Sequence, residues 1–91
     1  MIAAGRGLLS AQAAIARAFG QALRAARVAR GLSQEQLAEA GDFDRTHPSL
    51  LERGLRTPTF FVILSLAEGL NANPVALFTD AVARLRGQVF P

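Results

Sequence analysis

The sequence contains no cysteine, no lysine and no tyrosine. Without cysteine the chain forms no disulfide bond and no thiolate metal site, which fits a reducing compartment. The three missing residue types also remove several side chains that serve as catalytic nucleophiles. The remaining serine, histidine and acidic residues show no nucleophile–base arrangement, so we expect no enzyme activity and no cofactor.

Long apolar runs are absent as well. No stretch reaches the 18 or so consecutive apolar residues that a membrane-spanning helix needs. The alanine-rich segment 1–19 lacks the continuous apolar core of a signal peptide, because it is interrupted by Gly5, Arg6, Ser10, Gln12 and Arg17. We therefore expect a cytoplasmic protein without a membrane partner.

Length and composition describe a small folded domain. The chain has 91 residues, of which 51% are hydrophobic, enough for one core. Residues 1–30 carry five arginines and no acid, whereas residues 31–91 carry five arginines and seven acids. The basic N-terminal part is compatible with a polyanionic partner, but the net charge of +3 does not establish one.

Helix-capping residues recur along the chain, and no segment alternates polar and apolar residues as a strand does. A first helix is predicted from a Ser10 cap to Arg30, followed by Gly31 in a left-handed conformation. Gly20 lies in the middle of this segment and costs about 1 kcal/mol relative to alanine. The pattern leaves open whether the segment is one helix or two.

Four further helices are predicted from their terminal residues. Ser33 and Gln36 form a capping box, and Gly41 ends the helix that they begin. Two later segments begin with a cap followed by proline, at Thr57-Pro58 and Asn73-Pro74. The predicted segments are 33–41, 42–54, 57–71 and 73–87, which gives an all-α fold of five or six helices.

Segments 33–41 and 42–54 have the spacing of a helix-turn-helix, in which the first helix braces the second in the DNA major groove. The stretches RVARGLSQEQLAEAG (27–41), LERGLRTP (51–58) and NPVALF (73–78) closely resemble the Cro/lambda-repressor-like (XRE) family. The resemblance covers residues 19–78. It implies a lambda-repressor-like DNA-binding domain, flanked by helical extensions at 1–18 and 79–91.

The resemblance also assigns roles to single residues. Arg27 and Glu52 match an ion pair that links the first helix to the end of the recognition helix, and both are expected to be structural. Positions on the recognition helix and its lead-in are expected to read bases, for which arginine and hydroxyl side chains are suited: Arg45, Thr46, His47, Ser49 and Leu50. Phosphate contacts are expected from Gln34 and from the loop after the helix: Arg53, Arg56 and Thr57.

The sequence departs from the family pattern at two positions. The segment from Gly41 to Glu52 has one residue more than usual, most simply Asp42, and Pro48 stands where the family has an apolar helical residue. With Asp44 as the cap, the ring of Pro48 would press on the Asp44 carbonyl. With a cap at Thr46 or His47, Pro48 lies in the first turn, where proline is tolerated. We favour the later start.

His47 is the only histidine, and Asp42 and Asp44 lie close to it in the sequence. With no second histidine and no cysteine, a solvated or DNA-facing imidazole is favoured over a metal ligand. We therefore expect no metal site.

Apolar residues outside the family's core suggest a dimer surface. Phe60 fits an inward position of the family pattern, whereas Phe61 and Leu64 fall where the family has polar residues. The two chain ends either pack on each other or contribute to the dimer. A homodimer is expected, because one short helix reads few base pairs. The candidate interface residues are Phe61, Leu64, Val82, Leu85 and Phe90.

Two functions follow from these patterns. The first is a transcriptional regulator, expected to be a repressor, that binds double-stranded DNA at a palindromic operator as a dimer. The alternative is a protein-interaction module or antitoxin-like protein that uses the same fold and binds a partner such as a toxin.

Overall fold

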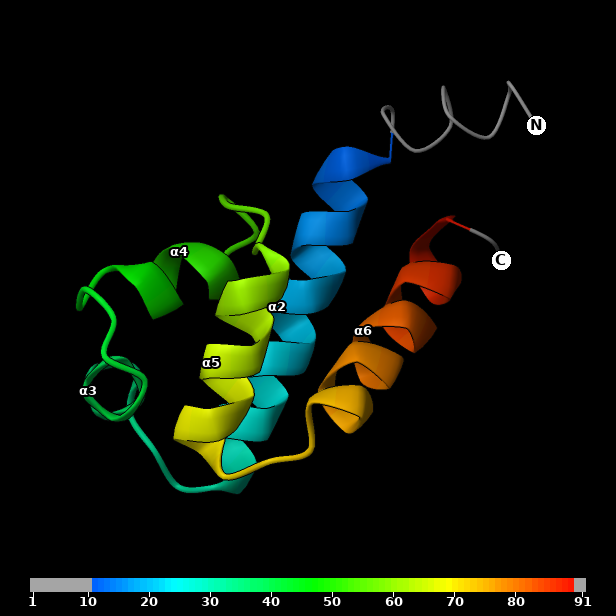
Figure 1. The fold of residues 1–91 in the computed structure, drawn as a ribbon. Coiled ribbons are helices and arrows are strands. Elements are labelled where there is room, and N and C mark those ends of the chain that lie inside the picture. The colour runs from blue at the N-terminus through cyan, green and yellow to red at the C-terminus, as the bar shows by residue number, and fades with distance from the viewer. Residues whose placement is uncertain (1–10, 90–91) are drawn as a thin grey trace.

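Residues 11–89 are described by a computed structural model and contain five α-helices and no strand, which confirms the predicted all-α class (Figure 1). The side chains of residues 88 and 89 lie outside the description. The helices are α2 (Gln12–Ala29), α3 (Gln34–Ala40), α4 (His47–Glu52), α5 (Phe60–Leu70) and α6 (Pro74–Val89).

Helix α2 is the centre of the arrangement. It packs against α4 and α6, while α3 packs against α4 and α5, and α5 packs against α6. Figure 1 shows α3 and α4 on one side of α2 and α6 on the other, with α6 running in the opposite direction to α2. The shared core is formed by apolar side chains from all five helices: Phe19, Ala22, Leu23, Leu37, Leu51, Leu66, Leu70, Leu77 and Ala81.

The first predicted helix is a single helix. α2 continues through Gly20, which is buried, and begins at Gln12 with Ala11 in the cap position. The predicted cap, Ser10, lies outside the described residues. A Cβ on Gly20 would overlap the carbonyl oxygen of Leu51. The absence of a side chain at Gly20 therefore lets α2 contact the end of α4 directly.

Four helices end in the same way. A residue with positive φ lies directly after α5 and two positions after the end of α2, α3 and α4. The N–H of the residue that follows it donates to the carbonyl five positions back, which satisfies a helix-end carbonyl. The positive-φ residues are Gly31, Asp42, Gly54 and Asn71. The ends predicted at Gly31 and Asn71 are confirmed. Gly41 also ends its helix as predicted, as the cap residue of α3, but it has φ −95°, and the left-handed position belongs to Asp42.

Two predicted boundaries were wrong. The cap of α5 is Thr59 and not Thr57, because the Thr59 hydroxyl accepts a hydrogen bond from Val62 N–H at 3.1 Å. Helix α6 continues beyond Gly87 to Val89, since a glycine lowers helix propensity without interrupting the backbone hydrogen bonds. The start at Asn73-Pro74 was correct, with Asn73 Oδ1 accepting from Val75 N–H at 2.8 Å.

Helices α2 and α6 run across the two boundaries expected at residues 18/19 and 78/79. Ile15 of α2 lines the same hollow as Val82 and Leu85 of α6. The described parts of the two ends therefore pack together. Among the described residues, no single helix is long and apolar enough to cross a membrane; α5 and residues 74–87 would suffice only together, and they meet at 115°.

Candidate nucleic-acid interface

The capping box that begins α3 is present as predicted. Ser33 Oγ accepts from Gln36 N–H at 3.0 Å, and Ser33 N–H donates to Gln36 Oε1 at 2.8 Å. These two bonds satisfy donors at the exposed end of the helix. Leu37 and Ala38 are buried on its inner face, as expected. α3 is thereby fixed in place although it has only seven residues.

A polar turn leads from α3 into α4. Asp44 Oδ1 accepts from the Thr46 N–H at 2.9 Å and from the Thr46 hydroxyl at 2.8 Å. These two bonds hold the pKa of Asp44 below its ordinary value of 3.8, and the bond from the Thr46 N–H contributes more than the bond from the hydroxyl. The charges of His47 and Arg56 lower this pKa by smaller amounts. Thr46 is the cap residue, and α4 begins at His47.

This start resolves the position of Pro48. The later of the two starts considered from the sequence is correct, because Pro48 lies in the first turn of α4. There its missing N–H removes no helical hydrogen bond. Pro48 is fully buried together with Leu51. The proline thus anchors the recognition helix to the core.

The buried side of α4 determines which residues it presents outward. Because residues three and four apart share a helix face, the positions opposite Pro48 and Leu51 form one surface: Thr46, Ser49, Leu50 and Arg53. Thr46 and Arg53 are exposed, and Ser49 and Leu50 are half-buried. His47 is also half-buried, and its ring meets that of Phe43 edge to face, with centroids 5.2 Å apart.

The end of α4 is tied to α2 by the ion pair between Arg27 and Glu52. Arg27 Nε lies 2.6 Å from Glu52 Oε2, and Arg27 Nη2 donates to Glu52 Oε1 at 3.0 Å. The side chains are only 13% and 3% exposed. The hydrogen bond to Glu52 raises the pKa of Arg27, while burial lowers it and the charge of Glu52 raises it further.

Two more groups complete this network. Arg27 Nη1 donates to the Leu32 carbonyl at 2.8 Å, and Gln34 Nε2 donates to Glu52 Oε1 at 3.1 Å. Gln34, expected to contact a phosphate, therefore also joins the start of α3 to the end of α4. A buried charge pair with its remaining donors satisfied fixes the geometry between elements. The network holds α2, α3 and α4 in one orientation.

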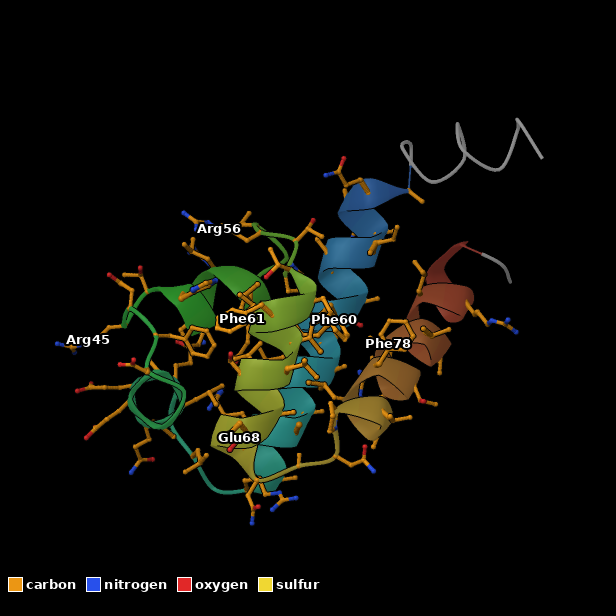
Figure 2. All side chains as sticks on the ribbon, viewed as in Figure 1. Arg45, Arg56, Phe60, Phe61, Glu68 and Phe78 are labelled. Carbon is orange, nitrogen blue, oxygen red and sulfur yellow. The ribbon has the colours of Figure 1, made fainter. Side chains whose placement is uncertain are left out.

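The arginines around α4 are exposed. Arg45 projects from the turn before α4, and Arg56 lies in the loop after it (Figure 2). Arg45 Nη2 lies 3.1 Å from Glu35 Oε2, in a pair open to solvent. Arg53 and Thr57 are exposed on the same connection as Arg56. Arginine side chains therefore flank the exposed face of α4, in the turn before the helix and in the loop after it.

The apolar residues proposed for a dimer are dispersed. Phe61 is 74% exposed, and Figure 2 shows it on the side of α5 that faces α4. Val82 and Leu85 are half-buried in the hollow against α2, and Phe90 lies outside the described residues. Phe60, expected to point inward, is 76% exposed. That expectation was wrong, because α5 begins only at Phe60 and the side chains of its first two residues lie outside the core.

Several contributors to this surface were not expected from the sequence. Glu35 and Arg45 are ten positions apart on different elements, and no local pattern predicts their contact. The spacing of Asp44 and Thr46, in contrast, is a recognisable turn signal. Within the described residues, no group of three or more histidine, cysteine or acidic side chains converges as a metal site would require.

Known proteins share this fold and sequence pattern. A family model described as "Helix-turn-helix domain" matches residues 18–78. The uncharacterized HTH-type transcriptional regulator y4dJ of Sinorhizobium fredii is 38% identical over 50 residues, 55% of this chain; the chain spans about two thirds (65%) of that protein.

Two solved structures are similar over most of their length. The restriction-modification controller protein C.AhdI of Aeromonas hydrophila is 44% identical, with a TM-score of 0.67 over 69% of this chain and 96% of that chain. The controller protein C.Esp1396I, solved as a tetramer with its natural 35-base-pair operator, is 25% identical, with a TM-score of 0.71 over 78% of this chain and 93% of that one. With the family match over residues 18–78, these likenesses show that the chain belongs to the helix-turn-helix family.

Proposed function

We propose that the chain is a transcriptional regulator that binds double-stranded DNA sequence-specifically, acting as a dimer on a palindromic operator and repressing transcription. One observation carries the proposal: the Arg27–Glu52 pair and the buried Pro48 fix α4 so that Thr46, Ser49, Leu50 and Arg53 face outward. A helix held rigidly with one polar face exposed is what major-groove reading requires.

The residues divide into two roles. Arg45 and Thr46 in the lead-in, with Ser49 and Leu50 on α4, read bases, because guanidinium and hydroxyl groups match base edges and leucine contacts a thymine methyl. Arg53, Arg56 and Thr57 contact phosphates and fix the position of α4 along the duplex. His47 and Gln34 contribute less to recognition, since each already contacts a neighbour within the module.

The relatives support this function. The operator complex of C.Esp1396I shows that a protein of this fold binds DNA as an oligomer, and y4dJ is described as a transcriptional regulator. We assign residues 19–78 to the helix-turn-helix domain and 1–18 and 79–91 to extensions, whose described parts belong to α2 and α6. The chain acts in the cytoplasm by binding alone, without catalysis.

Selection of bound sequences from random DNA duplexes tests the proposal. An inverted repeat should be enriched whose half-sites are centred about one helical turn, 10–10.5 base pairs, or a multiple of it apart. Enrichment of no motif, or binding that scrambled duplexes compete equally well, would show that the chain does not read DNA sequence.

A second function rests on the exposed Phe61. This ring lies on the α4-facing side of α5, where a protein such as a toxin could cover it. The function is then that of an antitoxin-like partner protein, with or without DNA binding. A partner retained by Arg45→Ala and lost by Phe61→Ser would support this function, and equal retention by both variants would oppose it.

A further inference from the structure

A recess lies between the first turns of α2 and the loop that follows α4. Its lining residues come from both elements: Gln12, Ala13 and Ala16 from α2, and Gly54, Arg56 and Thr57 from the loop. It measures about 560 Å³ and opens to solvent. Figure 1 shows the loop, in green, beside the blue first turns of α2, with α6 on the other side of α2. This feature is called the α2–loop recess below.

Arg17 stands beside the recess, one helical turn after Ala13. A Cβ on Gly54 would lie 2.8 Å from Cγ and 3.0 Å from Cα of Arg17, so the loop rests directly on the stem of this side chain. Arg17 is exposed, and among the described residues it forms no ion pair and no hydrogen bond. Because the stem packs on the loop while the charged end stays in water, the guanidinium of Arg17 is available to an anion at this place.

Both walls of the recess are free of acidic residues. Residues 11–30 contain four arginines and no acid, and residues 53–67 contain two arginines and no acid. Glu52, the acid directly before the loop, is already paired with Arg27. The recess therefore lies between two segments of positive charge, which attract a polyanion.

The loop also offers hydrogen-bond donors. The N–H groups of Gly54 and Leu55 donate to carbonyls of α4, whereas within residues 11–89 those of Arg56 and Thr57 donate to no protein group. The Thr57 hydroxyl and the Gln12 amide add side-chain donors. Backbone N–H groups, hydroxyls, amides and guanidinium groups are the donors that contact phosphate oxygens in DNA complexes. The lining of the recess thus matches a phosphodiester group in both charge and hydrogen bonding.

We propose that the α2–loop recess binds the phosphodiester backbone of DNA just outside the base pairs that α4 reads, with Arg17 as its principal cation. This inference rests on the proposed function. Gly54 is two residues beyond the end of α4, a chain length of at most about 7 Å. Because a DNA strand advances about 3.4 Å along the axis per phosphate, the strand that meets Arg53 and Arg56 reaches the recess within a few nucleotides.

The α2 wall of the recess lies outside the domain that the relatives share. Gln12, Ala13, Ala16 and Arg17 all precede residues 18–78, which match the helix-turn-helix family. The two turns of α2 that carry them therefore add a contact to the flank of the operator, beyond those assigned to α4 and its loop. Such a contact increases affinity and salt dependence without reading sequence.

Fluorescence anisotropy with two duplexes of equal length and sequence tests the proposal. Both contain the selected inverted repeat with about four base pairs added at each end, enough for the reach estimated above. In the second duplex the added linkages are neutral methylphosphonates. We compare the wild type with Arg17→Gln, which keeps much of the stem against Gly54 and removes the charge. Arg86→Gln, an exposed arginine on α6, is the control.

The wild type and Arg86→Gln should bind the neutral-flank duplex roughly tenfold more weakly than the phosphate-flank duplex, as the loss of charge-assisted contacts predicts. Arg17→Gln should bind both duplexes with the weaker affinity. On the phosphate-flank duplex its salt dependence should be smaller by about one ion per bound chain. Wild-type affinities that are equal for the two duplexes, or an Arg17→Gln variant that still loses tenfold on neutral flanks, would overturn the proposal.

A second pair of variants tests the recess without altering Arg17. Ala13 is exposed on the α2 wall, so that Ala13→Glu and Ala13→Gln should both fold. Ala13→Glu should weaken binding to the phosphate-flank duplex roughly tenfold, because the acid repels the strand, and Ala13→Gln should bind as the wild type does. Equal affinities of these two variants would also contradict the proposal.

The design separates this inference from the proposed function. If neither duplex is bound, both proposals are wrong. If DNA is bound without regard to sequence, the proposed function is wrong, but Arg17→Gln should still reduce the salt dependence on a scrambled duplex, since phosphates carry no sequence information. If sequence is read and Arg17→Gln behaves as the wild type, only the recess proposal is wrong.

Discussion

The backbone of Gly20 in α2 lies directly against the backbone of Glu52 at the end of α4. A Cβ on Gly20 would lie 2.6 Å from the Glu52 carbonyl oxygen and closer still to that of Leu51. Glu52 is also the partner of Arg27, which lies about two turns further along α2. One stretch of α2 therefore fixes the end of the recognition helix by both a close backbone approach and an ion pair.

Replacement of Gly20 by alanine should destabilise the fold, although alanine favours helix by about 1 kcal/mol. The added methyl group meets backbone carbonyls that cannot rotate away, and we expect a net loss of about 2 kcal/mol in the free energy of unfolding. Urea denaturation measures it. Gly87→Ala is the control, because that Cβ would meet nothing within 4 Å; it should be neutral or slightly stabilising. Equal effects of the two variants would show that the α2–α4 contact is not tight.

Removal of the charge of Glu52 should be costly. Glu52→Gln leaves the guanidinium of Arg27 largely buried, with the Leu32 carbonyl as its remaining strong acceptor, and we expect a loss of about 3 kcal/mol. Arg84→Gln disrupts the i,i+4 pair with Asp80, which is about 40% exposed on both sides, and should cost under about 0.5 kcal/mol. Thermal and urea unfolding of both variants give the comparison. A loss below about 1 kcal/mol for Glu52→Gln would contradict the structural role of the pair.

Glu35 should oppose DNA binding while it holds Arg45. Its carboxylate is 3.1 Å from Arg45 Nη2 on the proposed DNA face, where it repels phosphates and competes with DNA for the guanidinium. Glu35→Gln should therefore raise affinity several-fold at low salt, with less gain as salt screens the charge. The control is Glu39→Gln, an exposed acid on the same helix. Fluorescence anisotropy with a labelled duplex measures both, and equal gains would mean that only net charge matters.

Acid should weaken the lead-in to α4. The pKa of Asp44 in the folded protein is below its ordinary value of 3.8, so the charged carboxylate stabilises the fold above that value. The stabilisation disappears as pH falls through the lowered pKa. The difference in unfolding free energy between wild type and Asp44→Asn should be constant above about pH 5 and shrink below pH 4. If this difference in unfolding free energy instead grows as the pH falls, folding raises the pKa of Asp44, which contradicts the two hydrogen bonds from Thr46.

The elements that could be predicted from the sequence are those fixed by local chemistry. Ser33 and Gln36 form their box because both bonds close within one turn. Pro48 allows only a start that places it in the first turn of α4. Asn73-Pro74 combines a cap with a preset φ, and α6 begins there.

The features that could not be predicted depend on tertiary contacts. From the sequence alone, Gly20 only lowers the helix propensity of α2. The structure shows that a larger residue there would overlap the end of α4. The sequence indicated Thr57 as the cap of α5, whereas in the structure Thr59 takes that role and accepts from Val62 N–H. The outward position of Phe60 follows from that shift of the start of α5. The Glu35–Arg45 pair arises only because the turn at Asp42–Thr46 brings Arg45 back beside α3.

A comparison of DNA affinity among four proteins tests the central claim most directly. Wild type, Arg45→Ala and Arg56→Ala are titrated by anisotropy against the selected duplex and a scrambled one, with Arg86→Ala on α6 as the control. We predict that Arg45→Ala loses selectivity for the chosen duplex, worth about 1–3 kcal/mol. Arg56→Ala should weaken binding to both duplexes alike and flatten the salt dependence. If Arg45→Ala discriminates the two duplexes as well as wild type and Arg86→Ala do, the face that begins at Arg45 does not read DNA.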